Sequence, residues 1–122
     1  MKRILTAVIL VLILAAICIS SRITTVKTVS HMSDLLNEAE NNSSLQTVEN
    51  AEKIQSSWEQ KKKLLMTYTG HEELAEISDS IFALSELIRN GKTDEFISEC
   101  RNAQNALRHF EHSEKITFEN IL

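Results

Sequence analysis

The chain has 122 residues, enough for one small domain, and it contains no proline and only two glycines. Ordinary proteins carry about 5% proline and 7% glycine, and sheet folds need them for turns, so this depletion predicts an all-α fold. Thirteen basic and seventeen acidic residues give a net charge of −4. An acidic domain is a poor candidate for binding nucleic acid, because phosphate binding needs clustered lysine and arginine. It would also be repelled by anionic lipid headgroups.

The amino-terminal segment is basic and then apolar. Lys2 and Arg3 come first, and every residue from 4 to 19 except Thr6 is apolar. Extended to Ile23, this segment is long enough to cross about 30 Å of hydrocarbon at about 1.5 Å per residue. We expect residues 1–23 to form a transmembrane anchor and residues 24–122 an extracytoplasmic helical bundle, whose first helix can be continuous with the anchor. The basic start predicts a cytoplasmic amino terminus and an extracytoplasmic domain in the cell membrane.

A cleaved signal peptide is the alternative for the same segment. Cys18 and Ser20 would supply small residues before a cut at Ser21. The apolar core of such a signal peptide would be at the long end of the usual length of about 7–15 residues. A lipoprotein site at Cys18 is not indicated, because Ile17 stands where a small residue is needed. The sequence leaves anchor and signal peptide open.

Two helices are predicted directly after the anchor. Apolar residues recur every three or four positions over 24–40, and no helix-breaking residue separates this stretch from the anchor. Ser43 with Gln46 resembles a capping box that would start the next helix, over about 45–67. Within that helix, Glu59 and Lys63 have the i,i+4 spacing of a favourable ion pair. The two predicted apolar faces are Val26, Val29, Met32, Leu35, Leu36 and Ala39, then Val48, Ala51, Ile54, Trp58 and Leu65.

Two further helices complete the chain. The third is predicted over about 71–90, with Gly91 placed to end it, and Thr93 is a plausible N-cap for the fourth. The tail, ITFENIL, is apolar enough to dock on the other helices. The predicted apolar faces are Leu74, Ile77, Ile81, Leu84 and Ile88, with Phe82 and Leu87 alongside, and then Phe96, Cys100, Ala103, Leu107 and Phe110. Short loops predict an antiparallel bundle of three to four helices after the transmembrane helix.

The stretch SSWEQKKKLLMTYTGHEEL (56–74) holds four candidate structural or interaction residues: Trp58, Lys62, Tyr68 and His71. Trp58 lies on an apolar face, where a lone tryptophan is usually a core residue. Lys62 follows one turn later, close enough for a cation–π contact with that ring. The lysine run is predicted to be a solvated face, with an anion or headgroup site as the less favoured alternative.

No catalytic, cofactor-binding or metal site is expected. GHEEL lacks the second histidine of a metalloprotease helix, since Ala75 stands four residues after His71. The pair His109 and His112 is too few ligands for a closed zinc site. Cys100 occupies a core position, where a thiol acts as a small hydrophobe.

The whole arrangement resembles a family of small membrane-anchored bacterial proteins, domain of unknown function 4363. A basic start, one apolar segment and a helix with a lone Trp58 precede GHEELAEISDSIFALSELI, and Asn120 to Leu122 close the chain. Two features depart from the family pattern: no second tryptophan follows Trp58, and Gly70 rather than an acidic residue precedes His71. The resemblance implies location and shape and supplies no catalytic residues.

The sequence therefore predicts a non-enzymatic, membrane-anchored protein that binds a membrane protein as an accessory subunit. A ligand-binding sensory bundle acting through a partner and a secreted helical protein are the two alternatives. No cofactor is expected, and the sequence does not indicate the oligomeric state.

Overall fold

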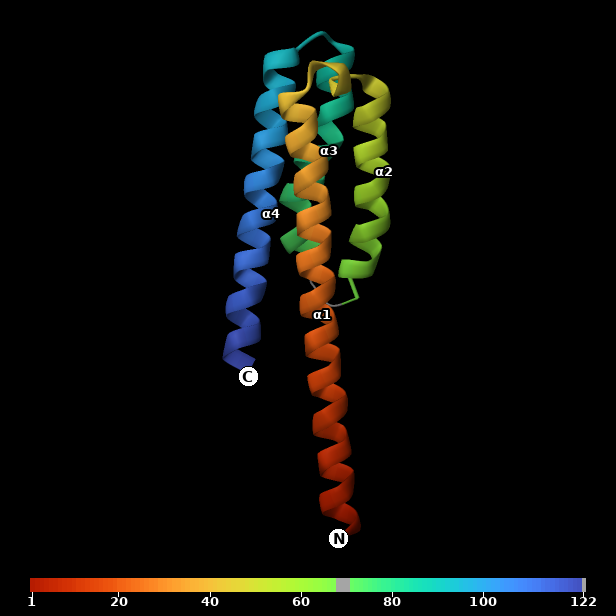
Figure 1. Ribbon diagram of the computed structural model, residues 1–122, viewed down its shortest axis with the longest axis vertical. Helices are drawn as coiled ribbons and strands as arrows, with labels where there is room; N and C mark the ends of the chain where they lie inside the picture. Colours follow the sequence, from red (N-terminus) through yellow and green to blue (C-terminus); the bar gives the residue numbers. More distant parts are fainter. Residues whose placement is uncertain (68–70, 122) are drawn as a thin grey trace.

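A computed structural model describes residues 1–67 and 71–121, and this part of the chain is helical without strands. Four α-helices are present: α1 (Lys2–Asn41), α2 (Val48–Leu65), α3 (His71–Arg89) and α4 (Thr93–Ile121), with a 3₁₀ turn, η1 (Ser43–Leu45), after α1. Figure 1 shows an antiparallel bundle from which the first half of α1 projects, with the carboxyl end of α4 running beside the part of it nearest the bundle. The predicted all-α class is confirmed.

Helix α1 is a single element of 40 residues. Its sequence contains no glycine or proline, so nothing interrupts the backbone hydrogen bonds between the apolar segment and the first bundle helix. The second half of α1 belongs to the bundle, where its buried residues are Thr25, Thr28, Val29, Met32, Leu36 and Ala39. The two segments expected over 1–23 and 24–40 are thus one continuous helix.

The bundle is closed by contacts between neighbouring helices. Helix α1 packs against α2 and α4, and α3 packs against the same two helices. The core consists of apolar side chains from all four, and every predicted core residue of α4 is buried, from Phe96 to Phe110. Six predicted face residues lie at the edge instead. Val26 is 39% exposed and Phe82 is 37% exposed, and the half-buried ones are Leu35, Val48, Leu87 and Ile88.

The turn between α1 and α2 differs from its prediction. The cap of α2 is Thr47, whose hydroxyl accepts a hydrogen bond from the Asn50 amide at 3.2 Å. Ser43 instead opens η1, where the Asn42 side chain accepts from the Ser44 amide at 3.1 Å. Both Asn42 and Thr47 are good capping residues, and the polar run between them gave no reason from sequence to prefer the later one.

The turn between α3 and α4 has the predicted form. Gly91 adopts φ +73°, and hydrogen bonds run from Gly91 N to Ile88 O (3.1 Å) and from Lys92 N to Leu87 O (2.9 Å). This pattern is a Schellman motif with glycine in the left-handed position. The tail after Phe110 is a continuation of α4, which extends beyond the ends of α2 and α3 (Figure 1), and Ile116 there is 46% exposed. The expectation that the tail docks on the bundle is wrong at Ile116.

Candidate functional site

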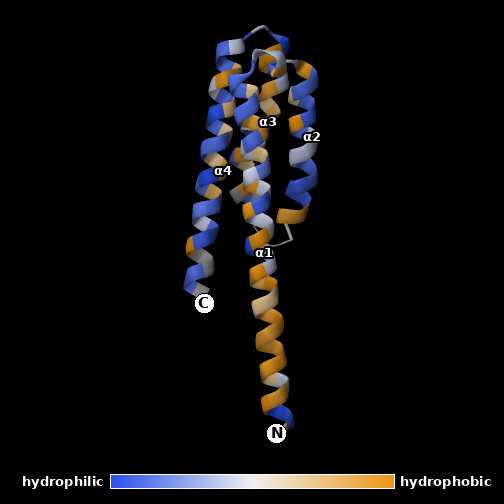
Figure 2. Cartoon of the chain, viewed as in Figure 1, coloured by the Kyte–Doolittle hydropathy of each residue, from blue (hydrophilic) through white to orange (hydrophobic). Residues whose placement is uncertain are grey.

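The most distinctive surface is the projecting half of α1. Its large apolar side chains from Ile4 to Ile23 are each 48–70% exposed, so they contact no other part of the described chain extensively. Figure 2 shows this apolar segment continuing directly into the mixed surface of the bundle. By length and composition this helix could cross a membrane, and a signal sequence would satisfy the same criterion.

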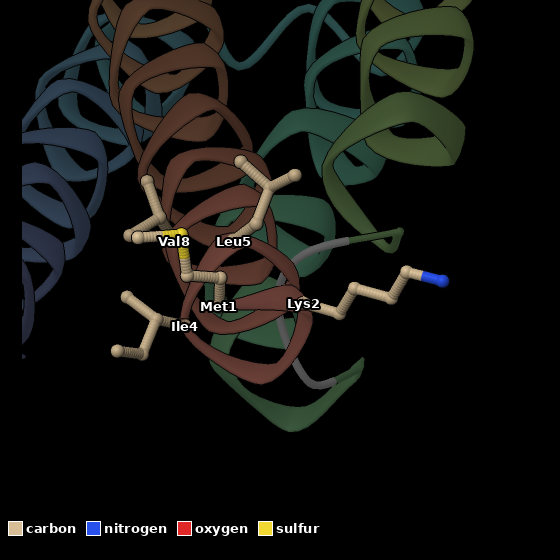
Figure 3. A pocket seen from close by; sticks show the side chains of 5 residues that line it. All are labelled: Met1, Lys2, Ile4, Leu5 and Val8. Carbon is tan, nitrogen blue, oxygen red and sulfur yellow. The ribbon is translucent and has the colours of Figure 1, made fainter.

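The tip of this half offers no enclosed binding site. A hollow there is lined by Met1, Lys2, Ile4, Leu5 and Val8. All five belong to the first turns of one helix, and Figure 3 shows their side chains spreading away from its axis. The hollow is the space between neighbouring side chains of an isolated helix, and the surface suits contact with lipid better than capture of a small molecule.

The projecting half joins the bundle at an ion pair. Arg22 of α1 and Glu111 of α4 approach to 3.6 Å between Nη2 and Oε1, and Nη1 of Arg22 also donates to the Glu111 carbonyl at 3.4 Å. Both side chains are at least two-thirds covered. The pair fixes α4 to α1 just before the buried face of α1 begins at Thr25.

Trp58 is a core residue, as predicted for this position. Its side chain is fully buried, and the indole Nε1 donates to Ser78 Oγ at 2.9 Å. The Ser78 hydroxyl in turn donates to Leu74 O at 3.0 Å. Ser78 was not singled out from sequence, although a lone polar residue on the apolar face of 71–90 is the signal that could have marked it.

The expected contact of Lys62 with the Trp58 ring does not form. The Lys62 ammonium lies 5.9 Å from the centre of the Phe82 ring on α3, while Trp58 is turned into the core. Phe82 is partly exposed, so this cation–π contact lies at the surface and is a weak one. Tyr68 lies outside the described residues. His71 is the first residue of α3, and its side chain also lies outside them.

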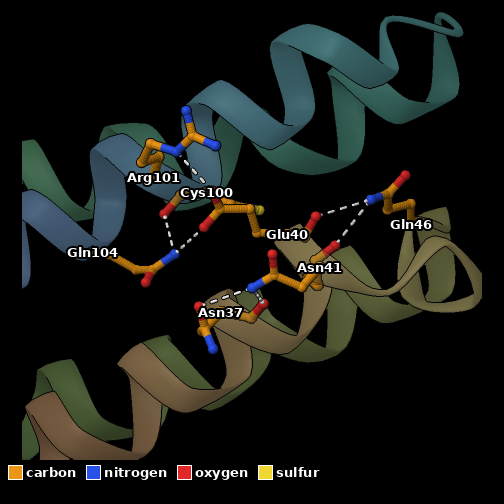
Figure 4. A network of polar contacts seen from close by, with 8 residues as sticks. Asn37, Glu40, Asn41, Gln46, Cys100, Arg101 and Gln104 are labelled. Carbon is orange, nitrogen blue, oxygen red and sulfur yellow. Dashed lines mark hydrogen bonds and ion pairs between the residues drawn. The ribbon is translucent and has the colours of Figure 1, made fainter.

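A polar network crosses from α1 to α4 at the opposite end of the bundle (Figure 4). Glu40 Oε1 accepts from Arg101 Nε at 2.6 Å, and Oε2 accepts from Gln104 Nε2 at 2.9 Å. Burial by itself would raise the pKa of Glu40, but hydrogen bonds from Arg101 and Gln104 together with the Arg101 charge lower that pKa overall. Gln46 donates to the carbonyls of Ala39 and Glu40, which are among the last of α1. These groups satisfy one another, and the network reads as structural.

The remaining titratable candidates form no reactive group. Burial raises the pKa of the Cys100 thiol to about 12, with smaller effects from the charges of Glu40 and Glu99. A thiol in that state is a poor nucleophile at neutral pH. Within the described residues, no group of three or more histidine, cysteine, aspartate or glutamate side chains is arranged to hold a metal ion. His109 and His112 are both exposed on α4.

One shallow groove runs between α3 and α4. It has a volume of about 260 Å³ and is lined by Glu72, Glu76, Ile77, Ala106, His109, Phe110 and Ser113. Its lining is mixed and open, whereas sites for small molecules are usually deep and mainly apolar with a few converging polar groups. The groove therefore does not have the form typical of a small-molecule site.

The profile of one protein family matches residues 20–121, the family described as Domain of unknown function (DUF4363). The chain belongs to this family. The match covers the whole bundle and the junction at Arg22. No curated protein and no solved structure matches the chain at a significant level. The family resemblance seen in the sequence is thus confirmed, and it carries no assigned chemistry.

Proposed function

We propose that the protein is a non-enzymatic, single-pass membrane protein whose bundle stands outside the cytoplasmic membrane and binds a membrane protein as an accessory subunit. The observation that carries the proposal is the exposed apolar half of α1, which is continuous with a well-packed bundle. Leaving the twelve large apolar side chains from Ile4 to Ile23 in water is unfavourable by about 25 cal/mol for each Å² exposed, and a bilayer removes that cost.

The orientation follows from charge. Lys2 and Arg3 precede the apolar segment, and positively charged flanks are retained in the cytoplasm. Arg22 on the other side is engaged by Glu111, so its charge is partly neutralised in the folded protein. The exposed Lys27 lies on the same side as Arg22 and counts against this orientation, so the motivation for a cytoplasmic amino terminus remains the pair Lys2 and Arg3 at the start of the span.

The accessory role rests on rigidity and on the absence of a reaction centre among the described residues. An uninterrupted rod through α1 would hold the bundle at a fixed height and angle above the bilayer, which suits a subunit that docks on a neighbouring membrane protein. A helical bundle on a flexible linker would not give this fixed placement.

Membrane partition and intact mass test the anchor together. The protein carrying a carboxy-terminal tag is expressed, membranes are extracted at alkaline pH, and the recovered chain is weighed by mass spectrometry. We expect a full-length chain that stays in the membrane pellet and a tag that external protease removes from intact cells. A chain beginning near Ser21 in the soluble fraction would instead establish the secreted alternative.

The secreted alternative retains one supporting observation. The first buried residue of α1 is Thr25, so a cut before Ser21 would leave the packed part of α1 and the Arg22–Glu111 pair intact. The bundle would then be a stable product. For the accessory role, zero-length crosslinking in native membranes should join the bundle to one membrane protein in fixed stoichiometry, and a chain that remains uncrosslinked would contradict it.

A further inference from the structure

The carboxyl end of α4, residues 112–121, extends beyond α2 and α3 and lies beside the projecting half of α1 (Figure 1). The ion pair between Arg22 of α1 and Glu111 of α4 marks the point where this extension begins. Among the described residues, none after Phe110 belongs to the core of the bundle. The end of α4 is therefore held to the rest of the protein mainly by its contact with α1.

The burial of α1 shows how far this contact reaches. Ala15 and Cys18 are half-buried, whereas Ala16 and Ile17 between them are exposed. Positions 15, 18 and 22 lie on one side of a helix, so the two half-buried residues continue the face that carries Arg22. Helix α4 is the element that packs beside this part of α1 (Figure 1). The end of α4 thus covers one face of the apolar segment as far as about Ala15.

This contact conflicts with a complete membrane span. Residues 4–14 of the apolar segment are all exposed, and they cover only about 16 Å at about 1.5 Å per residue. The hydrocarbon of a bilayer is about 30 Å thick. A bilayer that took in α1 as far as Ile23 would also take in the end of α4, where Lys115 and Glu119 are exposed. Charged side chains in contact with hydrocarbon are strongly unfavourable.

We propose that residues 112–121 leave α1 when the apolar segment enters a bilayer, so that docking of this end of α4 depends on the depth of insertion. The inference rests on the proposed membrane anchor and adds a second conformation to it. In the docked conformation the end of α4 covers part of the apolar face. In the inserted conformation lipid takes that place, and the charged residues of the end of α4 stay in water. The Arg22–Glu111 pair precedes the separating residues and is retained.

The local sequence favours this separation. The end of α4 contains Ile116, Thr117 and Phe118, three consecutive residues of low helix propensity. A segment this short is only marginally helical in water once it loses its tertiary contacts. Helix α4 contains no glycine or proline that would act as a hinge. We therefore expect residues 112–121 to fray from the carboxyl end rather than swing outward as a unit.

Bilayer thickness sets how much of α1 must be free of α4, and it provides the test. The full-length chain with Cys18→Ala and Cys100→Ala receives spin labels at Ala16→Cys and Asn120→Cys, two exposed positions. It is reconstituted in phosphatidylcholine with acyl chains of about 14 or about 22 carbons, and pulsed electron resonance measures the distance between the labels. Packed helices lie about 8–10 Å apart, which places the labels within about 20 Å of each other. We expect the share of this short distance to be at least about threefold smaller in the thicker bilayer.

A second pair of labels is the matched control. Ser30 and Asn105 are exposed on α1 and α4 within the bundle, where core residues hold the two helices together. The distance between labels at these positions should be the same in both bilayers. A change in this pair would mean that the bundle itself opens, and it would overturn a movement confined to residues 112–121.

Three other results separate this proposal from the anchor. A short distance between positions 16 and 120 in both bilayers, with the two termini cleaved by protease from opposite sides of sealed vesicles, would overturn the proposal and leave the anchor intact. A long distance in both bilayers would show that the end of α4 does not pack on α1 even where thickness permits, which also overturns it. Termini cleaved from the same side would refute the membrane span and this proposal together.

Variants of the end of α4 test the physical cause. Lys115→Leu with Glu119→Leu removes two exposed charges that would meet hydrocarbon, so we expect the short distance to persist in the thicker bilayer. Glu95→Leu with Arg108→Leu makes the same change at exposed positions of α4 within the bundle, and this chain should separate as the parent does. Equal behaviour of the two variants would contradict the proposal, because charge would then not drive the separation.

Discussion

The hydrogen bond between Trp58 and Ser78 permits a quantitative test of the packing. Replacing Ser78 with alanine removes the acceptor 2.9 Å from a fully buried indole N–H. A buried donor left without a partner costs about 1–3 kcal/mol, and the lost oxygen leaves almost no cavity. We therefore expect Ser78→Ala to lower the free energy of unfolding by about 2 kcal/mol.

The same substitution should be nearly harmless once the donor is gone. In the Trp58→Phe background, the Ser78 hydroxyl bonds only to Leu74 O on its own helix, and removing it should cost about 0.5 kcal/mol or less. The difference between the two backgrounds, about 1–2 kcal/mol, is the coupling energy of the pair. Ser80→Ala, at a half-buried position two residues away, is the matched control and should stay within about 0.5 kcal/mol of wild type.

Guanidinium unfolding in a mild detergent, followed by far-ultraviolet circular dichroism, measures all four variants without relying on tryptophan fluorescence. Unchanged slopes of free energy against denaturant would validate the comparison. If Ser78→Ala costs the same in both backgrounds, the bond does not stabilise the protein and the reasoning is refuted.

Four further substitutions or conditions have defined outcomes. Leu36→Ala, at a fully buried site, should lower the free energy of unfolding of the bundle by about 2–5 kcal/mol. Leu12→Ala, on the exposed half of α1, should leave that free energy unchanged. Equal effects would contradict the boundary between the two halves of α1. Gly91→Ala meets no atom within 4 Å but must hold φ +73°, so we expect a loss of about 1 kcal/mol in the same assay, and a neutral result would mean that the turn relaxes. The pKa of Glu40 is lowered from its ordinary value of 4.5, so its contribution to the free energy of unfolding is present above that pH and is lost as the pH falls through the folded-state pKa. At pH 7, wild type and Glu40→Gln should differ in stability by about 1 kcal/mol or less, because Arg101 is largely exposed. The two stabilities should converge on acidification. With a pKa of about 12, Cys100 should react with iodoacetamide at pH 8 roughly a thousandfold more slowly in the folded than in the unfolded chain, as peptide mass spectrometry would show, and fast labelling of the native protein would contradict its burial.

The helices were predictable because each carries a regular apolar face. Leu74, Ile77, Ile81 and Leu84 are all buried as their spacing of three and four residues indicates, and α3 begins at the expected His71. The absence of any breaker near Ile23 likewise indicated that the apolar segment and the first bundle helix could be continuous. In these places local pattern and tertiary packing demand the same conformation.

The specific contacts were less predictable because they depend on neighbours from other helices. Sequence spacing predicted that Lys62 contacts Trp58. In the structure the buried indole hydrogen-bonds to Ser78 on α3, and the Lys62 ammonium lies over the ring of Phe82, which is also on α3. The Glu40 network joins α1 to Arg101 and Gln104, more than sixty positions away in the chain. Neither pairing has a signal within one helix, because only the order of helices in the bundle brings these residues together.

The central claim is that one continuous helix is lipid-exposed over its first half and packed in the bundle over its second. A spin label at Leu12, compared with one at the exposed Ser30, tests it directly in full-length protein reconstituted in bilayers after Cys18 and Cys100 are replaced. The account predicts that the label at position 12 collides readily with oxygen and hardly with a water-soluble nickel chelate, and that the label at position 30 shows the opposite preference. Free access of the nickel chelate to position 12 would contradict the account.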